Sequence, residues 1–306
     1  MNNILIIGGA GYIGTVLTKI LISNEYNVTI IDNLTHRVNT PFIFLDSKNF
    51  NFVQIDVIRD FNANYFENFD YVINLAAIVG APACNSNPSM AIELNQKFVE
   101  FLSKVPNIKL IQASTCSNYG ARVGGNCNEY TPLNSLSVYG DTKIAAEKII
   151  FDNCNSISLR VATGYGISPR FRADLIVHEF IYKAMKEKSV LIYESHYQRA
   201  FIHVVDIAFA YLHAIKKFDI LKGKSWNVVT ENFSKKELIE KIQKFINFNA
   251  IFAEVGKDPD QRNYAVDGTR FFSTGFFGTK LVEDSIPEII NTFKIIIKEK
   301  SIYTNV

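Results

Sequence analysis

Short apolar runs alternate with stretches of helical periodicity along the first half of the chain. The runs ILIIGG, NVTIIDN, FVQIDV, YVINLAA and IKLIQAST have the length and apolar character of buried strands. In YIGTVLTKILISNEY, SMAIELNQKFVEFLSKV and TKIAAEKIIFDN, apolar residues recur at helical spacing, and SISLRVATGYG predicts a sixth strand. This alternation predicts an α/β fold with a doubly wound parallel sheet.

The rhythm changes after about residue 165. A loop and helix in SPRFRADLIVHEFIYKAMKEK precede an isolated strand, VLIYE, and a helix over FIHVVDIAFAYLHAIKKF; SWNVVT predicts another strand and KKELIEKIQKFI another helix. No Gly/Ser linker separates the halves, so we expect one compact body with a cleft between two lobes. We assign residues 1–165 and 201–226 to the sheet domain, and residues 166–200 and 227–306 to a smaller α/β lobe over its carboxyl edge.

Composition and charge argue against several classes of partner. The 306 residues are 48% hydrophobic, which is enough for a real core, and 32 basic against 30 acidic residues give a net charge of +2. This balance gives no electrostatic reason to expect nucleic acid or an anionic membrane as partner. MNNILIIGGAGYIG lacks the basic start of a signal peptide, and no apolar run approaches the ~20 residues of a membrane span, so we expect a cytoplasmic protein.

The cysteines indicate neither a metal site nor a disulfide framework. No C-x-x-C pair and no histidine cluster accompanies them. Reduced and mostly buried thiols are expected in a cytoplasmic protein. The four cysteines are Cys84, Cys116, Cys127 and Cys154.

The segment GGAGYIG lies between a predicted strand and a predicted helix. Gly8, Gly11 and Gly14 would allow a tight turn and let the backbone approach a pyrophosphate at the helix N-terminus. Tyr12 and Ile13 belong to the same turn and are candidate cofactor contacts. A chance glycine turn is the alternative, but the strand before and the helix after supply the context of a dinucleotide-binding motif.

Asp32 ends the second predicted strand, 18 residues after Gly14. An acid at this place accepts hydrogen bonds from the adenosine ribose and repels a 2′-phosphate, which favours NAD over NADP. The nearby Arg37 argues in the other direction. The neighbouring Asn33 is a further candidate contact, and a turn cap is the alternative reading of the Asp-Asn pair.

The ends of the third and fourth strands supply further candidate cofactor contacts. Asp56, followed by Val57, could hold the adenine amino group, and a simple turn residue is the alternative. Leu75, Ala76 and Ala77 close the fourth strand. Their small side chains suit close passage of a cofactor, but they suit helix–sheet packing equally well.

Thr115 closes the fifth strand in STCSNYG. Its hydroxyl would point into the crevice at the carboxyl ends of the strands, where ligands bind in such sheets. A polar strand end that makes its own turn is the alternative.

Tyr139 precedes Lys143 by one helical turn in SVYGDTKIAAEK. An ordinary surface pair is the alternative to a catalytic one. A phenol with a pKa of about 10 needs a shift of roughly three units, or about 4 kcal/mol, to act as a base at neutral pH. A cation ~4 Å away, at an effective dielectric of ~20, supplies that amount. We therefore predict that Lys143, together with a nicotinamide cation and the helix N-terminus, lowers the pKa of Tyr139.

Two arginines are candidate ligands of a substrate diphosphate. Arg199 in RAFIHVVD could clamp it through two hydrogen bonds. Arg262 in DPDQRNYAVD is the second, with a surface loop cation as the alternative. In the first segment, we interpret His203 as a structural partner of Asp206 rather than as a catalyst.

Together these segments resemble the extended short-chain dehydrogenase/reductase superfamily, in its nucleotide-sugar epimerase/dehydratase group. The resemblance covers nearly the whole chain and rests on GGAGYIG, DNL, NLAA, STCSNYG, YGDTK, RAFIHVVD and NYAVDGTRFFSTGFFG. It implies that the sheet domain is an NAD-binding Rossmann domain and that the smaller lobe binds a nucleotide sugar. It also implies a homodimer formed by the apolar stripes of the helices near residues 90–104 and 140–153, with packing of the same stripes on the sheet as the alternative.

The resemblance also implies roles for the site residues. Thr115 would bond the substrate hydroxyl, and Tyr139 would remove its proton as hydride leaves the sugar for NAD. Lys143 would hold the nicotinamide ribose. Arg199 and Arg262 would grip the nucleotide diphosphate.

Several positions depart from relatives of known chemistry. Sugar 4,6-dehydratases carry Asp-Glu where this chain has Cys116 and Ser117, so dehydration is not expected. Relatives that epimerise C3 and C5 have a cysteine at the place of Ser117, so stereoinversion by carbon deprotonation is not expected. Ser117 is a candidate substrate contact. Thr163 replaces an asparagine that helps to bind the substrate phosphate, whereas Asn95 matches a family asparagine near the active site.

The remaining chemistry needs only NAD and the Thr–Tyr–Lys set. LAAIVGAPAC, STCSNYG and SPRFRADLIVHEF resemble a branch that oxidises C4 of a GDP-linked heptose in capsular polysaccharide synthesis. We therefore expect oxidation of a nucleotide-sugar hydroxyl at C4. A nucleotide-sugar 4-epimerase is the alternative, and a non-catalytic NAD-binding sensor or scaffold is a second alternative, against which Thr115, Tyr139 and Lys143 argue.

Overall fold

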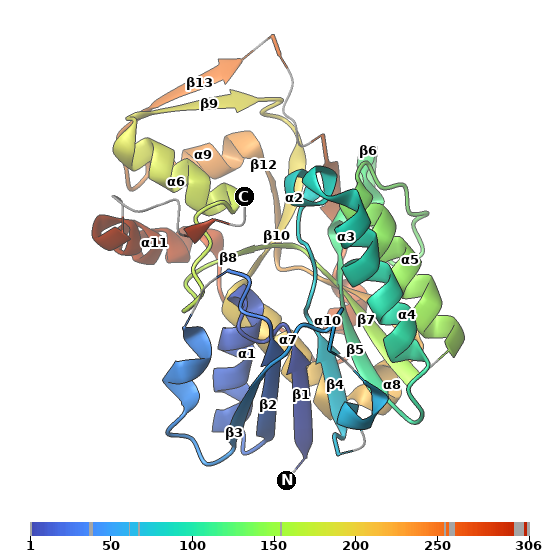
Figure 1. Cartoon of the computed structure of the whole chain (residues 1–306). Coiled ribbons are helices and arrows are strands. Elements are labelled where there is room, and N and C mark those ends of the chain that lie inside the picture. Colours follow the sequence, from blue (N-terminus) through green and yellow to red (C-terminus); the bar gives the residue numbers. More distant parts are fainter. Residues whose placement is uncertain are drawn as a thin grey trace.

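A parallel sheet of seven strands forms the centre of the larger lobe in the computed structural model (Figure 1). The strand order is β11-β7-β5-β4-β1-β2-β3, and all six pairings are parallel. The direction in which successive strands are added to the sheet reverses between β1 and β4. Ligands bind at such a switch point, outside the carboxyl ends of the strands. The strands are β1 (Asn3–Ile7), β2 (Asn27–Asp32), β3 (Phe50–Gln54), β4 (Tyr71–Asn74), β5 (Lys109–Thr115), β7 (Asn155–Val161) and β11 (Lys224–Val228).

The structure describes residues 2–36, 39–60, 62–66, 68–153, 155–253, 255–256, 261–296 and 303–304. Arg37, which bears on the choice of cofactor, lies outside these ranges, as does Cys154. Cys84, Cys116 and Cys127 are described, and all three are buried free thiols.

Helices cover both faces of this sheet, as the unbroken apolar strands predicted. Along β1, Ile4 and Ile6 face one hydrophobic core, while Leu5 and Ile7 face another, and all four are fully buried. The first core lies under α1 (Tyr12–Ser23) and α7 (Val204–Lys216), and the second lies under a long helical segment and α5. The bounds on this second face are α3 (Pro88–Ile92), the π-helix η3 (Glu93–Lys97), α4 (Phe98–Ser103) and α5 (Val138–Asn153).

The smaller lobe sits above the carboxyl edge of the sheet in Figure 1 and has a hydrophobic core of its own. It contains a three-stranded sheet, β12-β10-β8, and a two-stranded sheet, β13-β9. A capping box of Ser234 and Glu237 begins its helix α9. Its elements are β8 (Thr163–Tyr165), α6 (Ile176–Lys186), β9 (Ser189–Tyr193), β10 (Gln198–His203), β12 (Glu231–Ser234), α9 (Lys235–Gln243), β13 (Asn249–Ala253) and α11 (Val282–Ile296).

A fourth sheet connects the two lobes. In this sheet, β6, which follows β5 in the chain, pairs in parallel with β14 from the C-terminal half. The pairing brings β14 close to the end of β5. Neither strand was predicted, because β6 consists mostly of small and polar residues and β14 has only four residues. The remaining elements are η1 (Thr40–Phe44), η2 (Ala63–Phe66), α2 (Ala81–Ser86), η4 (Cys116–Tyr119), β6 (Ala121–Cys127), α8 (Phe218–Leu221), β14 (Asn263–Val266) and α10 (Thr269–Phe272).

Three predicted elements differ from the structure. The sixth strand is two strands, because β7 ends at Val161 and β8 pairs with β10 in another sheet. The strand VLIYE is not isolated, since β9 pairs with β13. Residues 201–203, which were predicted as the start of a helix, belong to β10, where Phe201 packs in the core of the smaller lobe.

The predicted domain boundaries do not follow the packing in every place. Residue 226 lies inside β11, which continues the large sheet to Val228. Tyr264, Phe271 and Phe276 lie in the core under α1 and α7, although residues 227–306 were assigned to the smaller lobe. The C-terminal half therefore contributes to both bodies.

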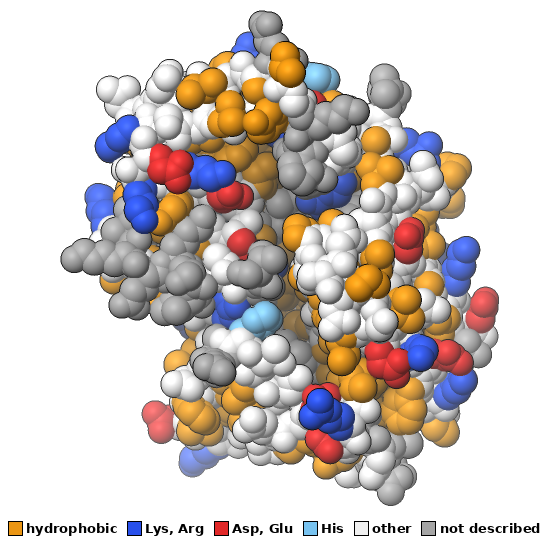
Figure 2. Space-filling view, turned by 45° about the horizontal axis from the view of Figure 1, so that its top comes forward, with side chains coloured by type: hydrophobic (Ala, Val, Ile, Leu, Met, Phe, Trp, Pro, Cys, Tyr) orange, Lys and Arg blue, Asp and Glu red, His pale blue; other side chains and the backbone are white. Residues whose placement is uncertain are grey.

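The surface carries charges of both signs. On the face shown in Figure 2, basic and acidic side chains are interspersed, in agreement with the small net charge. Within the described ranges, no helix has both the length and the apolar character needed to cross a bilayer.

Candidate active site

The glycine turn between β1 and α1 is shaped so that only glycine fits. Gly8 has a φ of 76°, and a Cβ there would lie 2.7 Å from the backbone nitrogen of Ala76. A Cβ on Gly14 would lie 2.5 Å from the carbonyl oxygen of Gly9. Gly11 caps α1, whose first turn contains no acidic side chain. The turn thus presents a helix N-terminus suited to a pyrophosphate.

Asp32 ties the end of β2 to this turn. Its Oδ2 accepts a hydrogen bond from the backbone N–H of Ala10 at 3.0 Å, and its Oδ1 accepts one from Leu34 at 2.8 Å. Burial raises the pKa of the Asp32 carboxyl group. Each carboxylate oxygen keeps a further acceptor site, which a ribose hydroxyl can use. The residues of the turn and of the β2 end therefore fit a dinucleotide.

The other predicted cofactor contacts have local partners. Asn33 Oδ1 accepts hydrogen bonds from the side chain and the backbone of Thr35, and Asp56 Oδ1 accepts one from Ile58 N–H at 3.0 Å. Both side chains thus form turns, and their contacts to a cofactor stay predictions. The backbone at Ala76 lies against Gly8, so close backbone passage explains the small residue there. Cofactor contacts of Ile13, Val57, Leu75 and Ala77 stay predictions.

The Tyr12 side chain points to the smaller lobe. Its hydroxyl donates to the carbonyl oxygen of Gly166 at 2.8 Å, and the Gly166 N–H donates to His178 Nε2 at 2.9 Å. Thr15 and Ser168 form a second contact between the lobes, with 3.0 Å between their hydroxyl oxygens. Only the backbone of Tyr12 is therefore left for a cofactor contact.

Asn95 fixes the loop that follows β4. The side chain is fully buried in the π-helix and forms two hydrogen bonds to the backbone of Ile78, at 2.9 and 3.0 Å. Its Nδ2 also donates to Thr142 Oγ1 on α5 at 3.2 Å. Asn95 therefore connects the cofactor side of the sheet to the helix that carries Tyr139.

Four predicted site residues meet at the carboxyl end of β5. Thr115 Oγ1 donates to Ser117 Oγ at 3.0 Å, and Arg262 Nη1 donates to the same oxygen at 2.7 Å. The Tyr139 hydroxyl is hydrogen-bonded to Thr115. Arg262 reaches this place because β14 pairs with β6. The guanidinium group lies beside the hydroxyl pair, so the surface-cation reading of Arg262 is wrong.

The pKa of Tyr139 differs from the prediction. Burial raises it to about 12, and this effect outweighs the Thr115 hydrogen bond and the charges of Arg262 and Arg172, which lower it. Part of the side chain is still exposed, but the surrounding protein removes enough water to disfavour the phenolate. The chain alone therefore does not make Tyr139 a base.

Lys143 is 2% exposed and lies close to Tyr139, with 6.0 Å between Nζ and the ring centroid. Nζ donates to the carbonyl oxygen of Ala113 at 3.0 Å. Burial lowers the pKa of Lys143 to about 8, while the nearby Cys84 and Glu147 raise it. The expected lowering of the tyrosine pKa by this lysine is thus absent from the chain alone, because both groups are desolvated.

The remaining candidates lie away from the hydroxyl pair or serve the fold. Arg199 is 1% exposed, and its Nη1 donates to the carbonyl oxygen of Gln198. His203 caps α7 by accepting from Val205 N–H, and Asp206 accepts from Thr279 and Lys280. Burial lowers the pKa of His203 to about 4, and the charge of Asp206 acts against this shift, so the two residues interact electrostatically.

The sequence reading missed Arg172. This residue forms an ion pair with Asp174, and its charge lowers the pKa values of both Tyr139 and Tyr12. Arg172 therefore lies in the region where the lobes meet. The segment SPRFRAD resembles a branch of the family, but no spacing within it predicts that Arg172 lies near Tyr139.

The comparisons with known proteins agree with this geometry. Residues 4–228 match the family described as "NAD dependent epimerase/dehydratase family". The chain is 31% identical over 223 residues to an uncharacterized UDP-glucose epimerase of Bacillus subtilis (strain 168). The matched region covers 66% of this chain and 69% of that protein.

Solved structures of two activities share the fold. The UDP-glucuronic acid 4-epimerase of Bacillus cereus, in complex with UDP-glucuronic acid and NAD, matches with a TM-score of 0.85 and 23% identity, over 96% of this chain and 99% of that one. The dTDP-glucose 4,6-dehydratase of Bacillus anthracis, in complex with NAD, matches with a TM-score of 0.82 and 22% identity, over 99% and 100%.

The glycine turn, the acid at the end of β2 and the Thr–Tyr–Lys set thus occur in the fold that the comparisons identify. The predicted fold class and the predicted cofactor, NAD, are confirmed. The chain belongs to the NAD-dependent epimerase/dehydratase family.

Proposed function

We propose that this protein oxidises a secondary hydroxyl of a nucleotide sugar, with Tyr139 as the base. The observation that carries the proposal is the cluster of Thr115, Ser117, Tyr139 and Arg262 at the end of β5, on the sheet edge that also carries the glycine turn. Bound NAD supplies a hydride acceptor and a positive charge at the nicotinamide ring.

The residues of the cluster divide the work. The hydroxyl of Thr115 would hold the substrate oxygen, and the phenolate of Tyr139 would take the proton of the substrate hydroxyl. A bound NAD would supply the acceptor for the hydride that the substrate carbon loses, so that a ketone and NADH would result. Tyr139 must first lose its own proton, so its pKa must fall from about 12. The value of about 12 already includes the lowering by Arg262 and Arg172, so the further fall must come from the positive charge of a bound, oxidised nicotinamide.

The same site argues against water elimination. Cys116 is 1% exposed, and its thiol donates to the carbonyl oxygen of Arg160 in the core. Burial also raises the pKa of this thiol far above neutrality. Ser117 offers only a hydroxyl, which already accepts from Thr115 and Arg262. Neither residue is suited to protonate a leaving hydroxide, as dehydration requires.

The finer assignment is oxidation at C4, within the branch that acts on a GDP-linked heptose for capsular polysaccharide. It is supported by the resemblance of three segments, and with it we propose a homodimer in the cytoplasm. A 4-epimerase, which returns the hydride to the opposite face, is the second candidate, and the relatives named as UDP-sugar epimerases favour it. The diphosphate contacts of Arg199 and Arg262 belong to this proposal too.

One experiment tests the proposal and separates the two candidates. The NAD-loaded protein is incubated with GDP-, UDP-, CDP- and dTDP-sugars, and the products are analysed by mass spectrometry and chromatography. Net oxidation predicts a product lighter by two hydrogens together with NADH, whereas epimerisation predicts an isomer of equal mass. Loss of water from any sugar, or no reaction with the whole panel, would contradict the proposed oxidation.

A further inference from the structure

Glu147 extends the catalytic face of α5 by one turn. Tyr139, Lys143 and Glu147 follow each other at four-residue spacing, so they lie on one side of the helix. Glu147 is 4% exposed. It lies one helical turn beyond Lys143, on the side of α5 that faces the sheet. A buried carboxylate needs partners, and these lie on β7 and β11.

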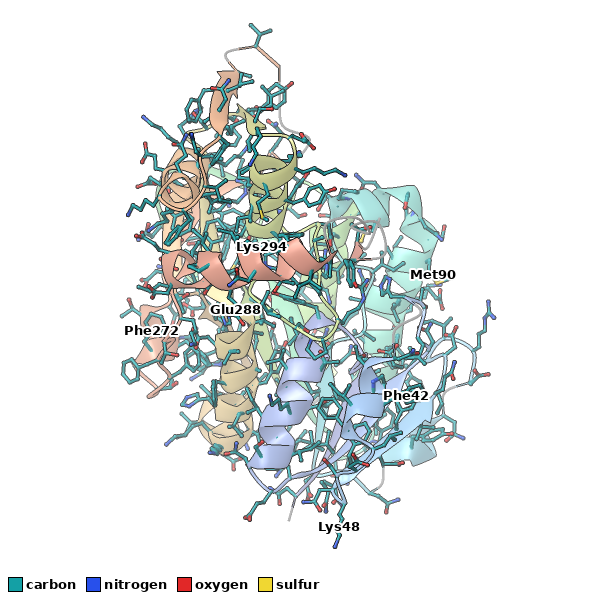
Figure 3. All side chains as sticks on the ribbon, turned by 90° about the vertical axis from the view of Figure 1, so that its left-hand side faces the viewer. Phe42, Lys48, Met90, Phe272, Glu288 and Lys294 are labelled. Carbon is teal, nitrogen blue, oxygen red and sulfur yellow. The ribbon has the colours of Figure 1, made fainter. Side chains whose placement is uncertain are left out.

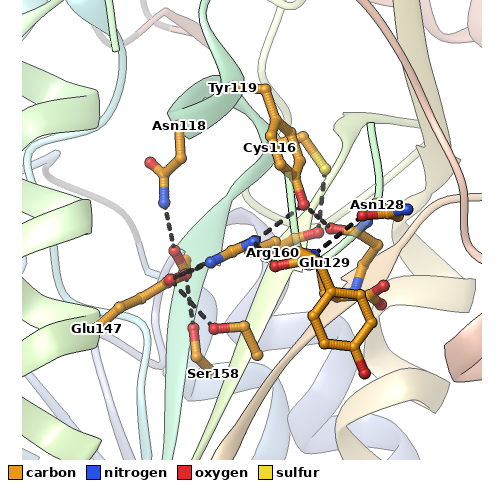
Figure 4. A network of polar contacts seen from close by, with 12 residues as sticks. Cys116, Asn118, Tyr119, Asn128, Glu129, Glu147, Ser158 and Arg160 are labelled. Carbon is orange, nitrogen blue, oxygen red and sulfur yellow. Dashed lines mark hydrogen bonds and ion pairs between the residues drawn. The ribbon is translucent and has the colours of Figure 1, made fainter. Parts of the chain in front are cut away.

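The partners of Glu147 satisfy both of its oxygens (Figure 4). Oε1 accepts from Ser158 Oγ at 2.9 Å and from Arg160 Nε at 3.0 Å. Oε2 accepts from Arg160 Nη2 at 2.7 Å and from Ser225 Oγ at 3.1 Å. The ion pair fixes α5 on the sheet at this point, since the Arg160 side chain is also only 6% exposed.

Arg160 in turn holds the turn η4 at both of its ends. Its Nη1 donates to the Tyr119 hydroxyl at 3.0 Å, and its carbonyl oxygen accepts from Cys116 Sγ at 3.1 Å. The Tyr119 hydroxyl donates onward to Asn227 Oδ1 at 2.7 Å. Tyr119 is fully buried, so Arg160 and Asn227 replace the water molecules that would otherwise bind its hydroxyl.

The turn η4 directly follows Thr115 and carries Ser117. Thr115 Oγ1 accepts from Ser117 N–H at 3.1 Å at its start, and the Gly120 N–H donates to the Ser117 carbonyl oxygen at 3.2 Å at its end. The side chain of Thr115 is also the hydrogen-bond partner of Tyr139. The two members of this pair thus stand on separate elements, α5 and the end of β5, and the Glu147–Arg160–Tyr119 contacts connect those elements.

We propose that this buried bridge of Glu147, Arg160 and Tyr119 positions the Thr115 hydroxyl against Tyr139. The inference rests on the proposed function and deepens it, because the three side chains act through Thr115 and do not touch the substrate. Such a role has a physical reason, since a misplacement of about 1 Å in a reacting group can cost roughly a hundredfold in rate. A buried ion pair is weak evidence for stability alone.

The variant Tyr119→Phe tests the bridge with the smallest change. It removes one hydroxyl and keeps the ring, which packs against Tyr264 with 6.3 Å between ring centroids. Replacement of Arg160 is less useful, because it would leave the Glu147 carboxylate buried without its counter-ion and is expected to unfold the protein. Tyr165→Phe is the matched control: Tyr165 is fully buried in the other lobe, and its hydroxyl also makes two hydrogen bonds.

Two readouts are measured on NAD-loaded protein. Amide hydrogen exchange at Ser117 and Gly120 should rise about tenfold in Tyr119→Phe and stay unchanged in the control. The rate constant for hydride transfer in a single turnover should fall about tenfold in Tyr119→Phe, with an unchanged Kd for NAD, and should stay within about twofold of wild type in Tyr165→Phe.

Each outcome decides the proposal. Unchanged exchange in Tyr119→Phe would overturn it, whatever the activity. Faster exchange with a wild-type rate of hydride transfer would also overturn it, because the turn would then be held without effect on the reaction. If wild-type protein transfers no hydride to NAD with any nucleotide sugar, the proposed function fails; the positioning role for this reaction falls with it, and the exchange data still show whether the bridge holds the turn.

Discussion

Without its cofactor, the phenol of Tyr139 is a poor base. The sequence correctly indicated that Thr115, Tyr139 and Lys143 lie near one another, but the predicted sign of the pKa shift was wrong, because a spacing shows proximity and not desolvation. Burial raises the pKa of Tyr139 to about 12 and lowers that of Lys143 to about 8. We infer that the charge of a bound, oxidised cofactor completes the activation, since the value of about 12 already includes the effect of the arginines.

Thr115→Val tests the hydroxyl that contacts Tyr139. The side chains have the same shape, but valine loses the hydrogen bond that lowers the pKa of Tyr139. Loss of a hydrogen bond to a charged group costs about 1.5–3 kcal/mol, so kcat should fall roughly 10- to 100-fold. The measurement is the steady-state rate of NADH formation.

Thr18→Val is the control for that variant. Thr18 is also fully buried, and its Oγ1 has no hydrogen-bond partner in the described part of the chain. Its kcat should equal that of wild type. Equal rates in Thr115→Val and in the control would show that the Thr115 hydroxyl has no role in the reaction.

Lys143 predicts a pH dependence of cofactor binding. Its folded pKa of about 8 lies below the ordinary 10.5, so the ligand-free protein loses this positive charge as the pH rises through about 8. If the charged form binds NAD, the Kd should rise by up to about tenfold between pH 7 and pH 9. Calorimetric titration measures this, and Lys143→Met should show weaker binding without that rise. A flat profile in wild type would contradict the role.

At the scale of elements, the strands with an unbroken apolar run and the helices of the large sheet were predictable, and the strands that connect the lobes were not. The unbroken apolar run of β1 predicts a strand, whereas β6 contains mostly polar or small residues and is defined by its pairing with β14. That pairing brings Arg262 to Ser117, 145 residues away in sequence. No local pattern encodes such a contact, so the surface-loop alternative for Arg262 could not be rejected from the sequence.

The junction of α6 with the loop after β8 predicts a loss of stability in acid. His178 Nε2 accepts from Gly166 N–H, and burial lowers its pKa to about 4. The unfolded chain binds this proton near pH 6.5 and the folded one does not, so stability is lost as the pH falls from about 6.5 towards 4. We expect a loss of about 2 kcal/mol from His178 between pH 7 and pH 5.

Urea unfolding at the two pH values measures this effect. His178→Gln should be less stable at pH 7 and should lose less stability on acidification than wild type. His196→Gln, at an exposed position, serves as the control and should behave like wild type. An equal acid-induced loss in His178→Gln and wild type would show that other groups cause it.

At the scale of the whole molecule, the helices opposite α1 and α7 offer an apolar surface for the proposed dimer. Met90, Ile92 and Phe101 are 41%, 39% and 36% exposed, and Figure 3 shows Met90 at the outer edge of the molecule. The apolar stripe of this helical segment is predictable from the sequence, but a stripe alone does not show how much of it the sheet covers. Here the sheet leaves part of it exposed.

The variant Ile92→Glu with Phe101→Glu should convert a dimer into a monomer, because two charges would be buried in each copy of the interface. Light scattering after size-exclusion chromatography gives the mass. Leu191→Glu, on the 47%-exposed side chain of β9 in the other lobe, is the control and should stay dimeric. A wild-type mass equal to the 34.6 kDa of one chain would end the dimer proposal.

The central claim is that Tyr139 removes the proton of a sugar hydroxyl while hydride passes to NAD. The most direct measurement mixes NAD-loaded protein with its nucleotide sugar in a stopped-flow instrument and records NADH formation in a single turnover. We predict NADH formation in wild type and a loss of at least about a thousandfold in Tyr139→Phe, with an unchanged Kd for NAD. A wild-type rate of NADH formation in Tyr139→Phe would contradict the account.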